Sequence, residues 1–223
     1  MKEGRFDALV FDMDGVLVDS EPLHMRATQS VLRPEGVDIP WEVFTDYIGT
    51  TVEATWADLM VRYKLKGEFD DYLRRYEEAI LFVLARKLEP EPGVWALITA
   101  ARQRGKRLAL ASSSRQSWIA ATLAGLAMTD VFEVIVSGEM APHGKPAPDI
   151  YLEAARRLGV LPRRCIAIED APRGVTAAKA AGMYAIAVRT AYTDAADLAP
   201  ADAIVNSLEE FDHALLDAAN GPP

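Results

Sequence analysis

Short apolar segments recur along the chain with helical patterns between them, and this alternation constrains the fold most. The segments are apolar throughout, which is typical of strands covered on both faces of a parallel sheet. In chain order they are residues 6–11, 107–111, 131–136, 165–168, 184–188 and 203–205. Glycines that typically end helices follow the intervening patterns at Gly105, Gly159 and Gly182. The pattern therefore predicts an α/β fold with a doubly wound, Rossmann-like parallel sheet.

The segment from residue 20 to residue 87 interrupts this alternation. It contains no convincing strand, and its apolar residues follow helical spacing, as at Trp56, Leu59 and Tyr63. The chain returns to the strand pattern after the stiff, proline-rich turn at residues 89–93. We therefore predict two domains: a catalytic core of residues 1–19 and 88–223, and an inserted, all-helical domain of residues 20–87.

Composition narrows the range of partners. The chain has 24 Lys and Arg against 33 Asp and Glu, a formal net charge of −9. Such a surface repels nucleic acids and anionic lipids, and no apolar run approaches the ~20 residues that span a bilayer. The single cysteine, Cys165, excludes an internal disulfide and is typical of a reducing compartment. We expect a cytoplasmic monomer that binds neither nucleic acid nor membrane.

Polar side chains gather where the predicted strands end. Because the carboxyl ends of parallel strands meet at one edge of a sheet, these side chains are expected to lie close together. In chain order they are Asp12 and Asp14, Ser112 to Ser114, Lys145, and Glu169 with Asp170. The sequence therefore predicts a site that combines carboxylates, hydroxyl groups and one ammonium group.

This combination of groups suits phosphoryl transfer. Carboxylates crowded at one spot repel one another unless a cation lies among them, and oxygen ligands are those that Mg²⁺ prefers. Lysine and serine can hold the phosphoryl oxygens, while one aspartate attacks phosphorus to form an aspartyl-phosphate. A second aspartate two residues on can protonate the leaving oxygen, provided that its pKa is raised from the ordinary value of about 3.9.

Four motifs carry a resemblance to a known family. The stretch DMDGVLVDSEP at residues 12–22 is similar to the first motif of the haloacid dehalogenase-like superfamily. More narrowly, it resembles the branch of phosphatases and β-phosphoglucomutases, in which a helical cap domain follows this motif. Residues 110–114, 144–149 and 168–174 resemble the other motifs in family order and spacing. The resemblance covers nearly the whole chain.

The resemblance implies catalytic and phosphate-binding roles for residues at the strand ends. It implies that Asp12 is the nucleophile and that Asp14 is the general acid and base. It also implies that Ser112, Ser113 and Lys145 hold the phosphate.

The resemblance further implies a Mg²⁺ cofactor at the same edge. The implied ligands are Asp12, Asp170 and the carbonyl of Asp14, with Glu169 in or next to the coordination shell.

Each motif also has a purely structural interpretation. The serines could cap the helix expected near Ser117, Lys145 could be a solvated turn residue, and the acids before Pro172 could complement a helix dipole. The occurrence of all four motifs at four strand ends favours a shared site.

The second aspartate narrows the reaction. The family's dehalogenases and phosphonate hydrolases lack it, so Asp14 favours cleavage of an oxygen ester. The β-phosphoglucomutases carry an arginine shortly after a glycine in the cap, whereas this chain has Val52 at that place after Gly49. We therefore predict a Mg²⁺-dependent phosphatase that acts on small phosphorylated metabolites, such as sugar or polyol phosphates. The alternatives are a β-phosphoglucomutase-type enzyme and a non-catalytic binding protein of the same fold.

Three residues of the helical insert are expected to bind the substrate and recognise its chemical groups. Thr51 and Glu53 follow the same glycine and could recognise hydroxyl groups. His24 resembles a histidine that many mutases carry, although a solvated helix histidine explains it as well. Dinucleotide and P-loop motifs are absent from the sequence, which argues against those classes of nucleotide-binding enzyme.

Overall fold

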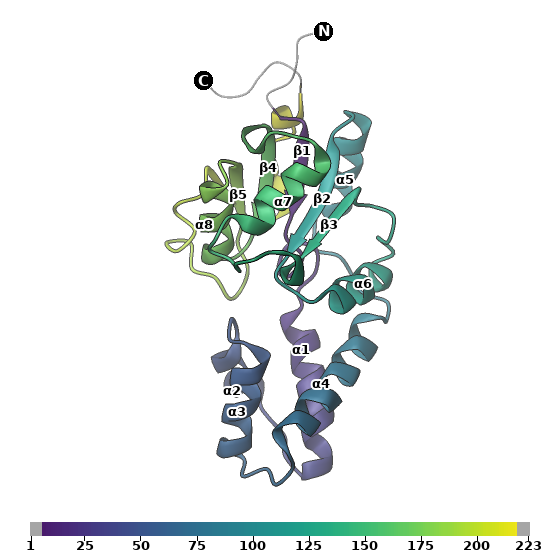
Figure 1. Ribbon diagram of the computed structural model, residues 1–223, viewed down its shortest axis with the longest axis vertical. Coiled ribbons are helices and arrows are strands. Elements are labelled where there is room, and N and C mark those ends of the chain that lie inside the picture. Colours follow the sequence, from purple (N-terminus) through teal and green to yellow (C-terminus); the bar gives the residue numbers. More distant parts are fainter. Residues whose placement is uncertain (1–5, 218–223) are drawn as a thin grey trace. The chain divides into compact units, whose positions relative to one another are not determined.

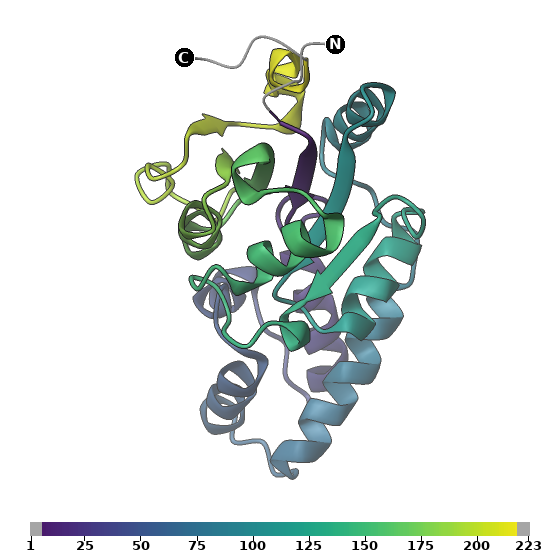
Figure 2. The same cartoon turned by 45° about the horizontal axis from the view of Figure 1, so that its top comes forward.

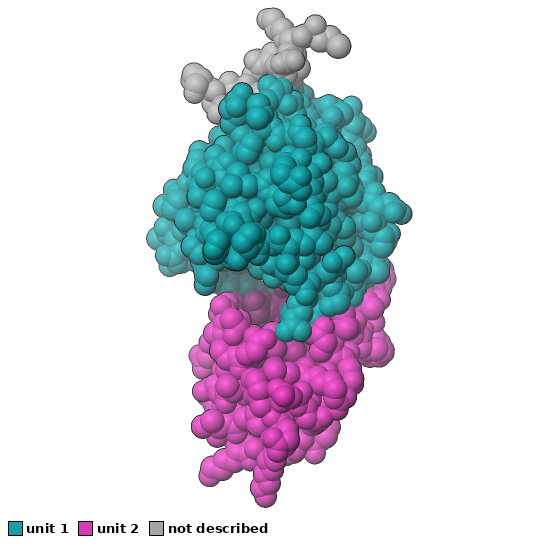
Figure 3. All heavy atoms as spheres, in the orientation of Figure 1, with its two compact units in different colours: residues 1–19, 88–223 teal, residues 20–87 magenta. Residues whose placement is uncertain are grey.

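The structure is a computed structural model that describes residues 6–217. The chain divides into two compact units, residues 1–19 with 88–223 and residues 20–87, here called the core and the cap (Figure 3).

The core is built on a six-stranded, fully parallel sheet with the order β3-β2-β1-β4-β5-β6 (Figure 1). The first strand therefore lies inside the sheet, between β2 and β4. The strands are β1 (Ala8–Phe11), β2 (Arg107–Ser112), β3 (Val134–Ser137), β4 (Cys165–Glu169), β5 (Tyr184–Val188) and β6 (Ala203–Val205). This architecture confirms the predicted doubly wound α/β fold.

One face of the sheet carries many small side chains. On this face, small residues such as Ala109, Ala167 and Ala185 pack against helices α7 (Asp149–Leu158) and α8 (Pro172–Ala180). These helices lie on one side of the strands in both Figure 1 and Figure 2. Small side chains allow a helix to approach the sheet closely, which brings groups on α7 and α8 near the strand ends.

The remaining helices of the core complete its cover. They are α5 (Val94–Gln103), which packs against β2, and α6 (Gln116–Gly125). Trp95 on α5 is 41% exposed, whereas Trp118 on α6 is buried.

Two predicted strands begin later than their apolar runs. The run at 131–136 becomes a strand only at Val134, although Val131 and Phe132 are buried. The first strand starts at Ala8, where its pairing with Arg107 begins. Burial alone produces an apolar run, whereas a strand also needs a paired neighbour.

The cap is all-helical, as predicted. Its helices are α1 (Glu21–Leu32), α2 (Trp41–Phe44), α3 (Val52–Arg62) and α4 (Phe69–Leu84). Helix α4 packs against α1 and α3, and the fully buried Trp56 stacks on Tyr72 with 5.5 Å between ring centroids. Gln29 fixes the turn after α1, because its side chain accepts from the N–H of Ile39 and donates to the carbonyl of Val37. Within residues 6–217, no helix has the length and apolarity needed to cross a membrane.

Candidate active site

The register of the sheet places Asp12 at the carboxyl end of its middle strands. Phe11 of β1 pairs with Leu110 of β2 and with Ile168 of β4. The N–H of Asp12 then donates to the carbonyl of Ile168 at 2.9 Å. Asp12 therefore lies directly after the last paired residue of β1, level with the ends of both neighbouring strands.

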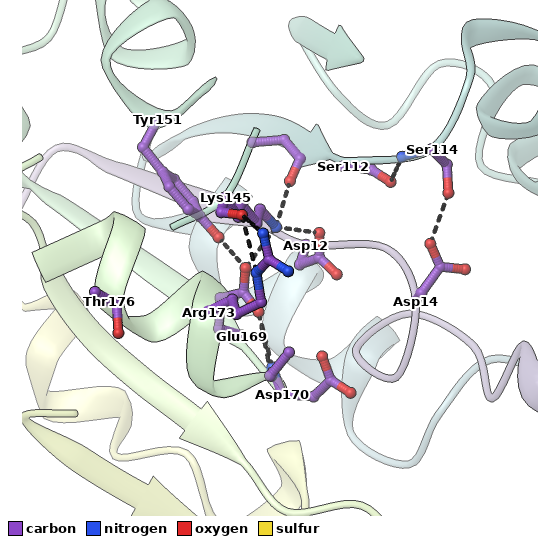
Figure 4. A network of polar contacts seen from close by, with 12 residues as sticks. Asp12, Asp14, Ser112, Ser114, Lys145, Tyr151, Glu169, Asp170, Arg173 and Thr176 are labelled. Atoms are coloured by element: carbon purple, nitrogen blue, oxygen red, sulfur yellow. Dashed lines mark hydrogen bonds and ion pairs between the residues drawn. The ribbon is translucent and has the colours of Figure 1, made fainter. Parts of the chain in front are cut away.

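Lys145 joins the carboxylates of two strands (Figure 4). Its Nζ donates to Oδ1 of Asp12 at 2.6 Å and to Oε1 of Glu169 at 2.5 Å. A longer contact of 3.3 Å reaches the carbonyl of Ala111. The Lys145 side chain is only 10% exposed, so these ion pairs lie in a region of low dielectric. The lysine predicted from a turn thus contacts the predicted nucleophile.

Glu169 is enclosed by donors on every side. Its Oε1 also accepts from the hydroxyl of Tyr151 at 2.5 Å, and its Oε2 accepts from the N–H groups of Asp170 and Ala171 at 3.2 and 3.3 Å. Gly174 of α8 lies so close that a Cβ there would overlap the Glu169 carboxylate. These donors occupy about the four acceptor positions that a carboxylate offers. Glu169 is therefore a fixed negative charge that holds Lys145 in place.

Burial and crowded charge shift the pKa values of the site. Burial raises the pKa of Asp12. The charge of Lys145 lowers this pKa in part, and the charges of Glu169 and Asp14 raise it further, so that the resulting value is about 7. Burial, followed by the charges of Glu169, Asp12 and Asp14, raises the pKa of Asp170 well above its ordinary value. Burial alone would lower the pKa of Lys145, but Asp12 and Glu169 outweigh it, so the pKa rises and the lysine stays charged.

The acidic residues form a group that fits a metal ion. One oxygen each from Asp12, Glu169 and Asp170 lie within 4.8 Å of one another. Oxygen ligands are those that Mg²⁺ and Ca²⁺ prefer, and a cation would relieve the raised pKa values of Asp12 and Asp170. Gly15 has a positive φ of 71°, and Asp170 fills the place where a Cβ would lie, so the loop after β1 approaches this group closely.

The serines after β2 lie beside the loop after β1. Ser112 is fully buried, and its Oγ accepts from the N–H of Ser114 at 3.1 Å. The Oγ of Ser114 donates to Oδ2 of Asp14 at 2.9 Å (Figure 4). Ser113 is exposed, and its carbonyl oxygen lies against Gly138. The core thus brings together the predicted residues from all four motifs.

The other predicted site residues belong to the cap. Nδ1 of His24 is 2.6 Å from the hydroxyl of Tyr76. Thr51 caps α3, because its Oγ1 accepts from the N–H of Ala54 at 3.2 Å. Glu53 is exposed in the first turn of α3. Their roles toward a substrate stay predictions.

Sequence reasoning missed three contacts in this site. Tyr151 was not singled out because a tyrosine on the apolar face of a helix has the pattern of a core residue. Arg173 was noted only within a motif, yet its guanidinium donates from Nε and Nη2 to the carbonyl of Lys145, at 3.0 and 2.6 Å. The contact between Ser114 and Asp14 joins residues 100 positions apart. The run of serines was the available signal for it.

Comparisons with known proteins agree with this geometry. Residues 6–182 match the family of haloacid dehalogenase-like hydrolases. The chain is 39% identical to Protein SUPPRESSOR OF QUENCHING 1, chloroplastic, of Arabidopsis thaliana over 86% of its length, but it spans only 19% of that protein. It is 33% identical to a phosphorylated carbohydrates phosphatase of Thermotoga maritima, covering 81% of this chain and 83% of the relative.

A solved structure extends the likeness to the fold. A variant of CbbY from Rhodobacter sphaeroides, crystallised in complex with xylulose-1,5-bisphosphate, has a TM-score of 0.80 and 32% identity, covering 95% of this chain and 99% of that one. The chain therefore belongs to the haloacid dehalogenase-like hydrolases, in the helical-cap branch whose motifs its sequence resembles.

Proposed function

We propose that the chain is a Mg²⁺-dependent phosphatase that hydrolyses small sugar or polyol phosphates through an aspartyl-phosphate on Asp12. The observation that carries this proposal is the contact of Asp12 with Lys145 in the core, within a group of carboxylates that includes Asp170. Asp14 lies two residues further along the chain, and its charge acts on Asp12. Such an arrangement offers a nucleophile, a cation for developing phosphoryl charge, and a second carboxylate for proton transfer.

In the first step, a carboxylate oxygen of Asp12 forms a bond to phosphorus while the bond from phosphorus to the ester oxygen breaks. Asp14 gives its proton to the departing ester oxygen, which leaves as an alcohol. Lys145 stabilises the charge on the phosphoryl oxygens, and the hydroxyl groups of Ser112 and Ser113 orient the phosphate.

In the second step, water attacks the phosphorus of the aspartyl-phosphate. Asp14, now a carboxylate, takes a proton from that water, and Asp12 leaves as a free carboxylate with inorganic phosphate as the product. Asp14 ends the cycle protonated, as it began.

Enzymes of this family use a divalent metal, and the donor set at the strand ends fits one. We propose that Asp12, Asp170 and the carbonyl of Asp14 would hold Mg²⁺, and that Glu169 would contribute mainly its negative charge, because its oxygens already accept hydrogen bonds. The ion would neutralise charge on the phosphate and on the crowded carboxylates.

The substrate class follows from the relatives and from the cap. The phosphatase from Thermotoga maritima is named for phosphorylated carbohydrates, and the CbbY structure holds a sugar bisphosphate. Val52 stands where β-phosphoglucomutases have an arginine, which disfavours tight binding of a second phosphate. Hydrolysis of a monophosphate is therefore favoured over transfer within a bisphosphate.

The deciding experiment measures phosphate release from a panel of sugar and polyol phosphates, with Mg²⁺ and with EDTA. The panel includes β-glucose 1-phosphate with a trace of the 1,6-bisphosphate, which is also assayed for glucose 6-phosphate. We expect Mg²⁺-dependent release of phosphate. Glucose 6-phosphate without free phosphate would establish a mutase instead, and no turnover of any ester would favour a binding protein.

We also propose that His24, Thr51 and Glu53 of the cap read the hydroxyl groups of the substrate. Glu53→Ala is expected to change the ranking of sugar phosphates more than turnover of p-nitrophenyl phosphate. Glu78→Ala is the matched control, because Glu78 is exposed on α4 and pairs with Arg74. An equal loss on every substrate would contradict a role in recognition.

A further inference from the structure

Ser114 is held in place from several directions. Its N–H donates to Oγ of Ser112 at 3.1 Å, and its carbonyl accepts from the N–H of Gly138 at 3.3 Å. With its backbone fixed to the ends of β2 and β3, the side chain of Ser114 has a defined place from which to donate to Oδ2 of Asp14 at 2.9 Å. This contact joins two motifs of the core (Figure 4).

The contact with Asp14 is not a by-product of helix capping. Helix α6 begins at Gln116, its N-cap residue is Arg115, and no side chain caps it through that residue. The N–H of Gln116 instead donates to the carboxylate of Glu139 at 2.8 Å. The capping interpretation of this serine run therefore does not explain the hydroxyl of Ser114.

We infer that Ser114 is a positioning residue that holds the carboxyl group of Asp14 in the orientation needed for proton transfer. This inference rests on the proposed function, in which Asp14 exchanges a proton with the ester oxygen and then with water. A hydrogen bond to one carboxyl oxygen restricts rotation of the group and leaves the other oxygen for the reacting proton. The hydroxyl proton of Ser114 stays on its own oxygen throughout.

The role has a specific kinetic consequence. A sugar alkoxide leaves with difficulty unless it is protonated, whereas p-nitrophenolate leaves readily without a proton. General acid catalysis typically contributes about 10²–10⁴-fold to rate, so loosening the acid removes part of this factor. Substitution of a residue that acts through Asp14 should therefore slow the hydrolysis of sugar phosphates and leave the hydrolysis of p-nitrophenyl phosphate nearly unchanged.

The test compares kcat for Ser114→Ala on p-nitrophenyl phosphate and on the sugar phosphate that the parent hydrolyses fastest. We expect a loss of about 10-fold on the sugar phosphate and a change of less than about twofold on p-nitrophenyl phosphate. Ser114→Thr, which keeps a hydroxyl group, should restore most of the loss. Thr176→Ala is the control, because it removes an exposed hydroxyl group on α8 that donates to the carbonyl of Pro172.

Several results would overturn the role of Ser114. An equal loss on both substrates would indicate phosphate binding or misfolding, and unchanged rates on both would show that Asp14 needs no such partner. Failure of Ser114→Thr to recover activity would also contradict a role for the hydroxyl group. A parent that hydrolyses neither ester would overturn the proposed function, and the inference with it.

Discussion

Lys145 is the residue on which the charge balance of the core depends, because it is the cation between two buried carboxylates. Lys145→Ala leaves Asp12 and Glu169 without this partner, so the free energy of unfolding should fall by about 3–5 kcal/mol. Urea unfolding in EDTA measures this change. Lys179→Ala, which breaks the more exposed pair with Asp202, should cost less than about 1 kcal/mol. Equal losses for the two variants would contradict the assignment.

Asp12→Asn distinguishes the role of Asp12 in catalysis from its role in folding. The amide keeps the volume of the side chain but is a poor nucleophile, so phosphate release should fall by more than about 10³-fold. The circular dichroism spectrum should match that of the parent, and the metal-free protein should be no less stable, because one charge leaves a crowded acidic group. Appreciable remaining turnover would show that another residue is the nucleophile.

At the scale of elements, the close packing of α8 against the end of β4 depends on Gly174. A methyl group at this position would overlap the carboxylate of Glu169. Gly174→Ala should therefore destabilise the protein by about 1–3 kcal/mol, even though alanine favours a helix by about 1 kcal/mol. Urea unfolding and phosphate release together test this. A stabilised protein with normal turnover would mean that Glu169 can move without consequence.

The residues of the site that could be predicted are those that come directly after a strand or a turn in the sequence. Asp12, Lys145 and Asp170 each follow a recognisable strand or turn, and a parallel sheet brings such residues to one edge. The position of Tyr151 depends on how α7 rotates over the sheet, which apolar periodicity alone does not set. The contact of Ser114 with Asp14 depends on the conformations of two loops. Local patterns therefore predict which elements meet, and packing decides which atoms touch.

At the scale of the whole molecule, the raised pKa of Asp12 links stability to pH. Its ordinary value is 3.8 and its value in the fold is about 7, so between these pH values the folded state keeps a proton that the unfolded chain has lost. The free energy of unfolding of the metal-free protein should therefore fall as pH rises through this window, by a few kcal/mol at most. The raised pKa of Asp170 acts in the same direction.

Urea unfolding in EDTA at pH 5 and pH 8 measures this dependence. Above pH 5 the carboxylate of Glu153 does not contribute, because hydrogen bonds from Arg156 and Arg157 hold its pKa at about 2. Asp12→Asn should flatten the slope, and Mg²⁺ should stabilise the parent more at pH 8, where the ligands lose their protons more readily. A slope unchanged by Asp12→Asn would assign it to other groups.

The position of β1 inside the sheet has a consequence for co-translational folding. This strand is made first, yet its two neighbours are β2 at residues 107–112 and β4 at residues 165–169. The cap is synthesised after β1 and before β2. Its helices pack on partners that are near in sequence, so they can form early. The nascent chain must carry β1 unpaired until β2 emerges, and one edge of β1 stays open until β4 emerges. Chaperones that shield exposed strand edges would therefore act on this chain between the synthesis of β1 and that of β4.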